Sequence, residues 1–240
     1  MHNPLTLTRF HPLLRWLVNK LTRLDLLANW YDEWLLSKHT IAADAQASAF
    51  LDFTLNKLDV SLQIDNPDRL QAVPAMGPLL VVANHPLGAL EGMLLSQLLL
   101  RQRTDLKVMV NDLLLSLPEF SDLFIGVDVL SPQPEQSNSR GLRQACRHLA
   151  QGGALLVFPA GTVSRMKLPS LSIDDVPWQN MIGRLAIKYR ALCLPIYIRD
   201  RNSRWFYFSE YMHRRLRTLL LPRAMLAKRN CVINAVIGHP

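Results

Sequence analysis

A short apolar run that passes through a histidine-bearing turn into a helical stretch constrains the fold of this chain more than any other feature. Residues 79–83, Leu-Leu-Val-Val-Ala, follow a Gly-Pro turn signal and are short and partly β-branched, which is typical of a buried strand. Residues 90–100 are longer and rich in leucine, which predicts a helix. The junction contains His85 and, six residues later, Glu91. A buried strand that ends in a catalytic loop has this pattern.

The same alternation of apolar runs and helical stretches continues through the chain. Strands alternating with helices predict an α/β fold: a single domain with a largely parallel central sheet flanked by helices. In such sheets the functional site lies beyond the C-terminal ends of the strands, where His85 and Gly161 are expected. Strands are predicted at 60–64, 79–83, 106–110, 124–129, 154–158, 191–198 and 231–237, helices at 43–58, 90–100, 112–117, 140–151 and 181–189, and a loop at 131–139.

An amphipathic helical segment precedes this domain. Residues 8–38 carry leucines at three- and four-residue spacing, while the basic residues among them lie mostly on other faces. Such a segment either packs on the core of its own domain or docks on a bilayer. We therefore divide the chain into an N-terminal helical segment at residues 1–58, suited to membrane association, and an α/β domain at residues 59–240.

Composition limits where the chain works. Its apolar fraction of 49% and mean hydropathy of +0.08 are high for a soluble protein, yet no window reaches the roughly 18 uninterrupted apolar residues of a transmembrane helix. The N-terminus lacks the ordered regions of a signal peptide, and three scattered cysteines are too few for a disulfide framework. These features predict a cytoplasmic protein with reduced thiols.

The net charge of +8 favours an anionic partner: nucleic acid, a phosphorylated cofactor or the cytoplasmic face of a membrane. Residues 199–229 hold nine Lys or Arg, mixed with aromatic side chains and leucines. This mixture suits an anionic lipid surface. The alternative is a solvated basic face with its aromatics in the core. Nucleic-acid binding is not expected, because no recognised nucleic-acid motif accompanies the basic segment.

His85 and Glu91 have the side chains of an acid-base pair. A neutral imidazole can take the proton of an attacking hydroxyl if a carboxylate fixes its tautomer and stabilises the imidazolium. A structural histidine beside a surface glutamate is the alternative for a bare pair. The sequence has no Gly-x-Ser-x-Gly elbow, no Walker loop and no metal-ligand spacing, which argues against a serine hydrolase and a metalloenzyme. A base without a protein nucleophile suits direct transfer to a substrate hydroxyl.

Several segments, in order, resemble the lysophospholipid acyltransferase superfamily. Residues 84–92, Asn-His-Pro-Leu-Gly-Ala-Leu-Glu-Gly, look like its first block, most of all in the bacterial hemolysin-like branch, which has Asn-His-Pro, a Gly-rich step and Asp-Gly. Residues 158–165, Phe-Pro-Ala-Gly-Thr-Val-Ser-Arg, are similar to the Phe-Pro-Glu-Gly-Thr block. Residues 107–128 and 194–196 loosely resemble the second and fourth blocks. Agreement of several blocks is more specific than any one alone.

The resemblance implies a peripheral enzyme at the cytoplasmic face of the inner membrane, with residues 59–240 as its acyltransferase domain. It would move a fatty acyl group from acyl carrier protein or CoA, as co-substrate, to the hydroxyl of a lysolipid, with no bound cofactor or metal and with an anionic membrane surface as a partner. His85 would be the general base and Glu91 would orient it. The residues expected to bind substrate are Asn84, Pro159, Gly161, Thr162 and Arg165.

Two positions depart from the family pattern. Glu91 replaces an aspartate and is one methylene longer, and Ala160 stands where phosphate-handling members carry glutamate. The second change fits a lyso-ornithine lipid acceptor, with a different lysophospholipid as the alternative. The glutamate at position 91 motivates another hypothesis, a lipid-binding or scaffold protein with a lapsed site. In such a protein Glu91 would point away from His85. Further sequence often follows the last core strand in the family, so we expect a shortened or compact member.

Overall fold

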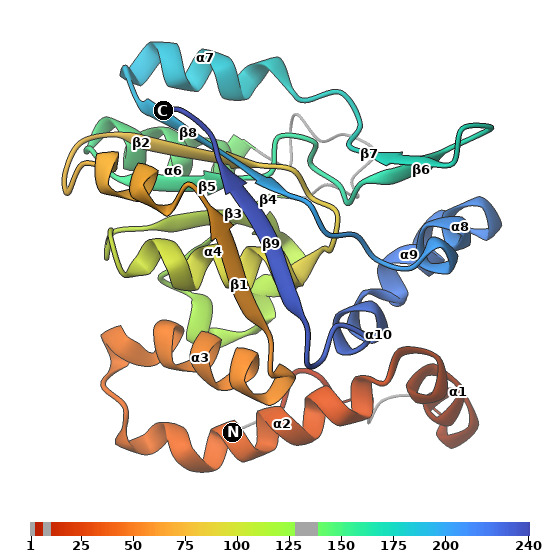
Figure 1. The fold of residues 1–240 in the computed structure, drawn as a ribbon. Coiled ribbons are helices and arrows are strands. Elements are labelled where there is room, and N and C mark those ends of the chain that lie inside the picture. Colours follow the sequence, from red (N-terminus) through yellow and green to blue (C-terminus); the bar gives the residue numbers. More distant parts are fainter. Residues whose placement is uncertain (1–2, 7–10, 128–138) are drawn as a thin grey trace.

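A mixed sheet lies at the centre of the computed structural model, which describes residues 3–6, 11–127 and 139–240. Seven strands of the described residues pair in the order β1-β9-β8-β2-β5-β3-β4 (Figure 1). All neighbouring strands are parallel except β8 and β9, which confirms the predicted α/β fold with a largely parallel sheet. The strands are β1 Ser61–Asp65, β2 Leu79–Ala83, β3 Lys107–Asn111, β4 Phe124–Val127, β5 Ala154–Val157, β8 Leu192–Ile198 and β9 Val232–Ile237.

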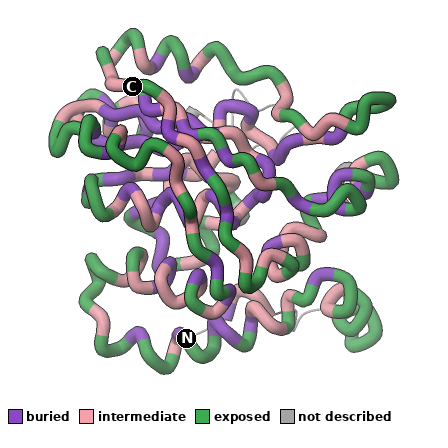
Figure 2. Tube along the Cα trace, viewed as in Figure 1, coloured by how far each residue is buried: buried purple, intermediate pink, exposed green. Residues whose placement is uncertain are grey.

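Helices cover both faces of this sheet. On β2, Val81 faces the larger core cluster with α2, α3 and α4, whereas Leu80 and Val82 face the cluster with α6 and α7. A strand buried on both faces reads as a continuous apolar run, and β2 does so. Figure 2 shows the buried residues gathered in the central strands and the exposed ones on the outer helices. The helices are α1 Pro12–Thr22, α2 Leu24–Ser37, α3 Gln46–Leu58, α4 Ala89–Leu100, α6 Ser139–Ala150, α7 Asn180–Tyr189, α8 Arg204–Met212, α9 Arg214–Leu219 and α10 Leu221–Leu226.

The helices α2 and α3 share the core of the sheet. Trp34 of α2 packs against Phe50 of α3, and Phe50 packs against Phe120, which follows β3. The buried carboxylate of Glu119 accepts hydrogen bonds from Tyr31, Trp34 and Lys38. An aromatic cluster and a buried ion pair therefore hold this part of residues 1–58 to the domain.

The helix α1 differs from α2 in the exposure of its apolar side chains. Arg23, in a left-handed conformation with φ of 60°, separates the two helices. Its leucines do not pack on the core of the domain, so that interpretation of the amphipathic segment is wrong for α1. The exposed fractions are 70% for Leu13, 59% for Trp16 and 52% for Leu17. No helix in the described residues has the length and apolar character needed to cross a bilayer.

Elsewhere the structure differs from the sequence prediction in local detail. Residues 112–117 were expected to be helical, and 112–116 form the short 3-10 helix η4, because so few residues before a proline cannot sustain an α-helix. Leu106 belongs to a turn before β3, since its N–H donates to the carbonyl of Arg103. The predicted strand at 124–129 is confirmed over Phe124–Val127, and its last two residues, with residues 131–138 of the predicted loop, lie outside the described residues. Ser139, expected to end that loop, is instead the first residue of α6. The other 3-10 helices are η1 Lys38–Thr40, η2 Ala43–Ala45, η3 Pro67–Ala72 and η5 Pro118–Phe120.

Two groups of secondary-structure elements occur in segments for which the sequence predicts no helix or strand. A two-stranded antiparallel hairpin, β6 Arg165–Lys167 and β7 Ser172–Asp174, follows the second motif. The basic segment forms α8, α9 and α10, of nine, six and six residues. Helices this short are marginal in isolation, and tertiary contacts hold them. Tyr207 and Met225 supply such contacts because both are buried.

Candidate active site

The first motif forms the loop between β2 and α4, at the C-terminal end of the central strand. Asn84 fixes the start of this loop by a pair of hydrogen bonds with the backbone of Ile198 in β8. Its Nδ2 donates to the carbonyl at 2.9 Å, and its Oδ1 accepts from the N–H at 2.6 Å. The side-chain amide of Asn84 therefore joins the ends of two neighbouring strands. Its contact with substrate stays a prediction.

The side chain of His85, in this loop, contacts the side chain of Glu91, in the first turn of α4. The Nδ1 atom of His85 is 2.9 Å from Oε1 of Glu91, whose side chain is fully buried. The same oxygen accepts the backbone N–H groups of Leu87 and Gly88, both at 3.0 Å. These bonds hold the carboxylate at the N-terminus of α4, where the helix dipole stabilises negative charge.

Two further features define the state of this pair. The imidazole N–H is not well aligned with the carboxylate, and the Oε2 atom of Glu91 has no hydrogen-bond partner among the described residues. Bonds of this type are often poorly aligned without substrate and tighten when it binds. The ring of Phe158 lies against the imidazole with 4.3 Å between centroids, so rotation of His85 is restricted. The side chain of His85 is 19% exposed, so part of the imidazole is accessible to a substrate.

The second motif, residues 158–165, follows β5 and reaches the same edge of the sheet, because β2 and β5 are parallel neighbours. Gly161 makes the turn with φ of +65°, a conformation that favours glycine. The N–H of Gln179 donates to the carbonyl of Pro159 at 3.1 Å. The N–H of Ser164 donates to the carbonyl of His85 at 2.9 Å. The two motifs are thus joined through their backbones, as the sheet order requires.

Asp175 helps to fix the backbone of His85 by hydrogen bonds. Its Oδ1 accepts the backbone N–H of His85 at 3.2 Å and the hydroxyl of Ser164 at 2.5 Å. Its Oδ2 accepts from Nε1 of Trp178 at 3.0 Å. The backbone of His85 is therefore fixed on both its N–H and its carbonyl side. No local sequence pattern marks Asp175, which lies 90 residues along the chain from His85.

The C-terminal segment fixes the other side of the histidine loop. The buried hydroxyl of Tyr207 donates to the carbonyl of Pro86 at 2.6 Å. The side-chain amide of Asn202 donates to the carbonyls of Pro86 at 3.2 Å and Leu87 at 3.1 Å. Burial raises the pKa of Tyr207 well above its ordinary value, so the hydroxyl remains a donor. Neither residue was singled out from the sequence, because their partners lie more than a hundred positions away.

Arg217 in α9 supports the second motif from the same segment. Its guanidinium donates to Thr162 Oγ1 at 3.0 Å and to the carbonyl of Ser164 at 3.3 Å, and it pairs with Glu210 at 2.6 Å. Glu210 also pairs with Nε of Arg165 at 3.2 Å. Two of the predicted substrate-binding residues, Thr162 and Arg165, therefore belong to one network with Arg217. Arg217 is buried, so part of the positive charge of residues 199–229 forms contacts inside the protein.

Thus the structure gathers all seven predicted site residues at one edge of the sheet, and adds Asp175, Asn202, Tyr207 and Arg217. In the part of the chain that the structure describes, no group of three or more His, Cys, Asp or Glu side chains is arranged to hold a metal ion.

The family follows from a comparison of the whole sequence. Residues 44–229, which include both motifs, match a family model described as acyltransferase. The chain belongs to the acyltransferase family. It is therefore an acyltransferase enzyme, and the membership expected from the motifs is confirmed.

Two curated relatives of this chain have the same name, lyso-glycine lipid O-acyltransferase. The protein from Phocaeicola vulgatus is 27% identical over 212 residues, covering 85% of this chain and 71% of the relative. The protein from Bacteroides thetaiotaomicron is 26% identical over 159 residues, covering 66% of this chain and 55% of the relative. The chain therefore spans only about half of the second relative.

Proposed function

We propose that this acyltransferase moves a fatty acyl group from the thioester of acyl carrier protein or CoA to the hydroxyl of a lysolipid. The observation that carries the proposal is the 2.9 Å contact between His85 and the buried Glu91 within the first motif. The two relatives, both named for an O-acyl transfer to a lysolipid, support the class of acceptor. A lyso-amino-acid lipid, such as a lyso-glycine or lyso-ornithine lipid, is the first acceptor to test, followed by lysophospholipids.

The reaction needs no protein nucleophile. Nε2 of His85 takes the proton of the acceptor hydroxyl as its oxygen attacks the thioester carbonyl, and Glu91 stabilises the imidazolium. When the tetrahedral intermediate collapses, the carbon–sulfur bond breaks and the imidazolium returns the proton to the leaving thiolate. An ester and a free thiol result, so atoms and charge balance.

The second motif would hold the reacting groups. Pro159 and Gly161 shape the turn beside His85, while Thr162 and Arg165 bring a hydroxyl and a guanidinium to the same edge. Such donors can bind an acyl carbonyl or a polar lipid headgroup. Asn84 would act by fixing the loop, since its amide is engaged with Ile198.

The competing hypothesis is a lipid-binding or scaffold protein with a lapsed site. It expects Glu91 to point away from His85. The contact between the two side chains, together with the hydrogen bonds that fix Glu91 Oε1, favours the enzyme.

Replacing His85 with alanine tests the proposal. We expect His85→Ala to lower acyl transfer to a lyso-amino-acid lipid by roughly a hundredfold or more, because the general base is lost. The control is His39→Ala, which changes an exposed histidine and should keep parental activity. Product is measured by mass spectrometry with acyl carrier protein and CoA thioesters in turn. Parental activity in His85→Ala would overturn the proposal.

We also propose that the enzyme works as a peripheral protein at the cytoplasmic face of the inner membrane, because its acceptor is a lipid and its net charge is +8.

A further inference from the structure

Exposed apolar side chains gather on three elements, α1, α8 and the β6–β7 hairpin. The last two adjoin the candidate site, because Tyr207 of α8 donates to the carbonyl of Pro86 and the hairpin begins at Arg165. The first is α1, whose Leu13, Leu14, Leu17 and Leu21 follow three- and four-residue spacing and are exposed by 36% to 70%. Trp16 borders this stripe, and the ammonium group of Lys20 lies 4.8 Å from the centroid of its ring. A helix of the domain core would bury such a stripe, and α1 leaves it open.

The second element is α8, which has two unlike faces. Its buried side contains Phe206 and Tyr207, and the latter holds the histidine loop. Its other side exposes Trp205 by 81% and Phe208 by 41%. Tyr211 and Met212 continue this exposed side by 51% and 71%. One short helix therefore connects the candidate site to an aromatic surface.

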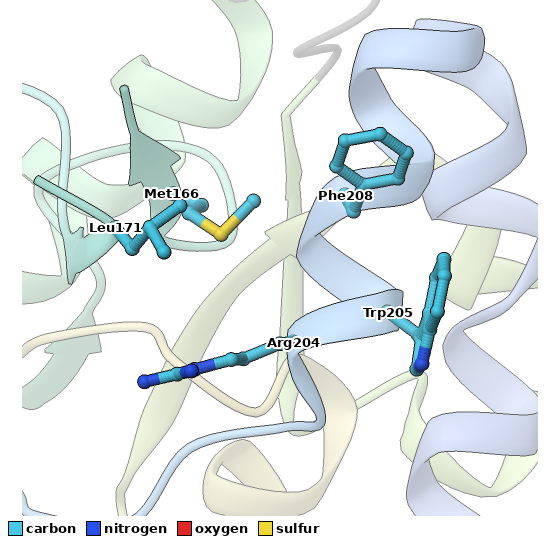
Figure 3. A pocket seen from close by; sticks show the side chains of 5 residues that line it. All are labelled: Met166, Leu171, Arg204, Trp205 and Phe208. Carbon is cyan, nitrogen blue, oxygen red and sulfur yellow. The ribbon is translucent and has the colours of Figure 1, made fainter. Parts of the chain in front are cut away.

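The third element is the β6–β7 hairpin, whose connecting turn exposes Leu168 and Leu171. A shallow groove of about 370 Å³ separates this hairpin from α8. Figure 3 shows Met166 and Leu171 on one side of the groove and Phe208 and Trp205 on the other, with the guanidinium of Arg204 across one end. The groove is thus apolar along its walls and cationic at its rim.

Hydrogen bonds connect these elements into one side of the molecule, at the right in Figure 1. Tyr211 of α8 donates to the carbonyl of Met166 in β6 at 2.5 Å. Arg223 of α10 donates to the carbonyl of Lys20 in α1 at 3.2 Å. We call the exposed residues of this side the docking face: Leu13, Leu14, Trp16, Leu17, Leu21, Leu168, Leu171, Trp205, Phe208, Tyr211 and Met212.

The charge on α1 and α8 identifies the kind of partner. Residues 11–23 contain Arg15, Lys20 and Arg23 but no acidic residue. Residues 201–212 contain Arg201, Arg204 and a single carboxylate, Glu210, which Arg165 and Arg217 neutralise. Leucines and aromatics beside cations suit the boundary between headgroups and acyl chains of an anionic bilayer.

We propose that the docking face binds the surface of an anionic lipid bilayer, with α1, α8 and the β6–β7 hairpin lying in the headgroup region. At 11 residues, α1 is too short to span a bilayer, which takes about 20, so it lies in the interface. Because Tyr207 ties α8 to the histidine loop, docking brings the lipid phase to His85. The inference rests on the proposed function for the identity of the partner, and its test is independent of catalysis.

Binding of the full chain to vesicles tests the docking face. The parent should sediment with phosphatidylglycerol–phosphatidylethanolamine vesicles, bind phosphatidylcholine vesicles more weakly, and lose binding as salt rises. Leu17→Glu and Trp205→Glu should each weaken binding about tenfold, because a carboxylate enters the interface and is repelled by anionic lipid. The matched controls are Leu36→Glu and Ile187→Glu, which change side chains that are 83% and 81% exposed on α2 and α7.

The outcomes separate this inference from the proposed function. Parental binding by both docking-face variants, or equal losses in the controls, would overturn the docking face. So would a parent that dimerises in sedimentation velocity through these residues, or that binds acyl carrier protein with them while ignoring vesicles. Activity of the same variants on a lysolipid below its critical micelle concentration should equal that of the parent. If no variant and no parent transfers acyl groups, the proposed function fails while the vesicle result still stands.

Discussion

Nδ1 of His85 lies 2.9 Å from Oε1 of Glu91, and the same oxygen caps the N-terminus of α4 through the N–H of Gly88. One carboxylate oxygen thus contacts the imidazole and fixes the loop that carries it. The longer side chain of glutamate, compared with the aspartate of the family pattern, reaches both partners from the third position of the helix.

Substitution of Glu91 separates these two contributions. Glu91→Gln keeps an oxygen that can accept the N–H groups of Leu87 and Gly88 but removes the charge that stabilises an imidazolium. We expect kcat to fall roughly a hundredfold with little change in folding, measured by acyl transfer and thermal unfolding. Glu91→Asp keeps the charge but withdraws it by one methylene, and we expect at least about a tenfold loss. Parental kcat in Glu91→Gln would contradict the role of the carboxylate.

Replacing Asp175 tests whether its hydrogen bonds hold the backbone of His85 in place. Asp175→Ala removes the acceptor of the His85 N–H and of the Ser164 hydroxyl, so the histidine loop loses its fixed position. We expect kcat to fall about tenfold with little change in KM, and the free energy of unfolding in urea to fall by about 1–2 kcal/mol. The neighbouring Asp174 pairs only with exposed groups of its own hairpin in the contacts described, Lys167 and Ser172, so Asp174→Ala should match the parent. Equal effects of the two variants would show that Asp175 has no special role.

Arg217 tests the support of the second motif. Arg217→Lys leaves one cationic nitrogen, which cannot reach Thr162, Ser164 and Glu210 together. We expect a loss of about 2 kcal/mol in the free energy of unfolding and about a tenfold loss of acyl transfer. Arg199→Lys is the matched control because Arg199 pairs with Asp65 at the surface, where the change should cost less than about 0.5 kcal/mol. A stability change as small as the control would refute a supporting role.

The buried Glu119 makes a prediction about stability and pH. Glu119→Gln leaves the ammonium group of Lys38 buried without its counter-ion, so the free energy of unfolding should fall by about 3 kcal/mol in urea denaturation. Glu33→Gln, which breaks an exposed pair with Lys57, should cost less than about 0.5 kcal/mol.

The pH dependence of that difference has a definite sign. Burial alone would raise the pKa of Glu119, but the hydrogen bonds from Lys38, its own backbone, Tyr31 and Trp34 together hold it below the ordinary value of 4.5. A carboxyl with a lowered pKa stabilises the fold above its ordinary pKa, and this contribution disappears as pH falls through the folded-state pKa. The difference between parent and Glu119→Gln should therefore be largest near neutral pH and shrink in acid. A difference that grows in acid would contradict the ion pair.

Local sequence patterns were sufficient to predict the strand, turn and helix around His85 and the position of the second motif. Apolar runs bounded by turn signals set β2 and β5, and the parallel order expected from alternating elements brought both motifs to one edge. Element ends shifted by one or two residues where a turn bond, such as that of Leu106, competed with the strand.

The α/β class, the acyltransferase motifs and the residues His85 and Glu91 could thus be predicted from local patterns in the chain. The roles of Asp175, Asn202, Tyr207 and Arg217 in holding these motifs, and the exposure of the α1 leucines, became evident in the folded chain alone. The difference lies in the distance along the chain between the contacting residues. Glu91 reaches His85 within one turn, whereas Asn202 and Pro86 lie 116 residues apart and Arg217 and Thr162 lie 55 apart. Contacts of that kind arise from how the sheet orders its strands and have no local signature.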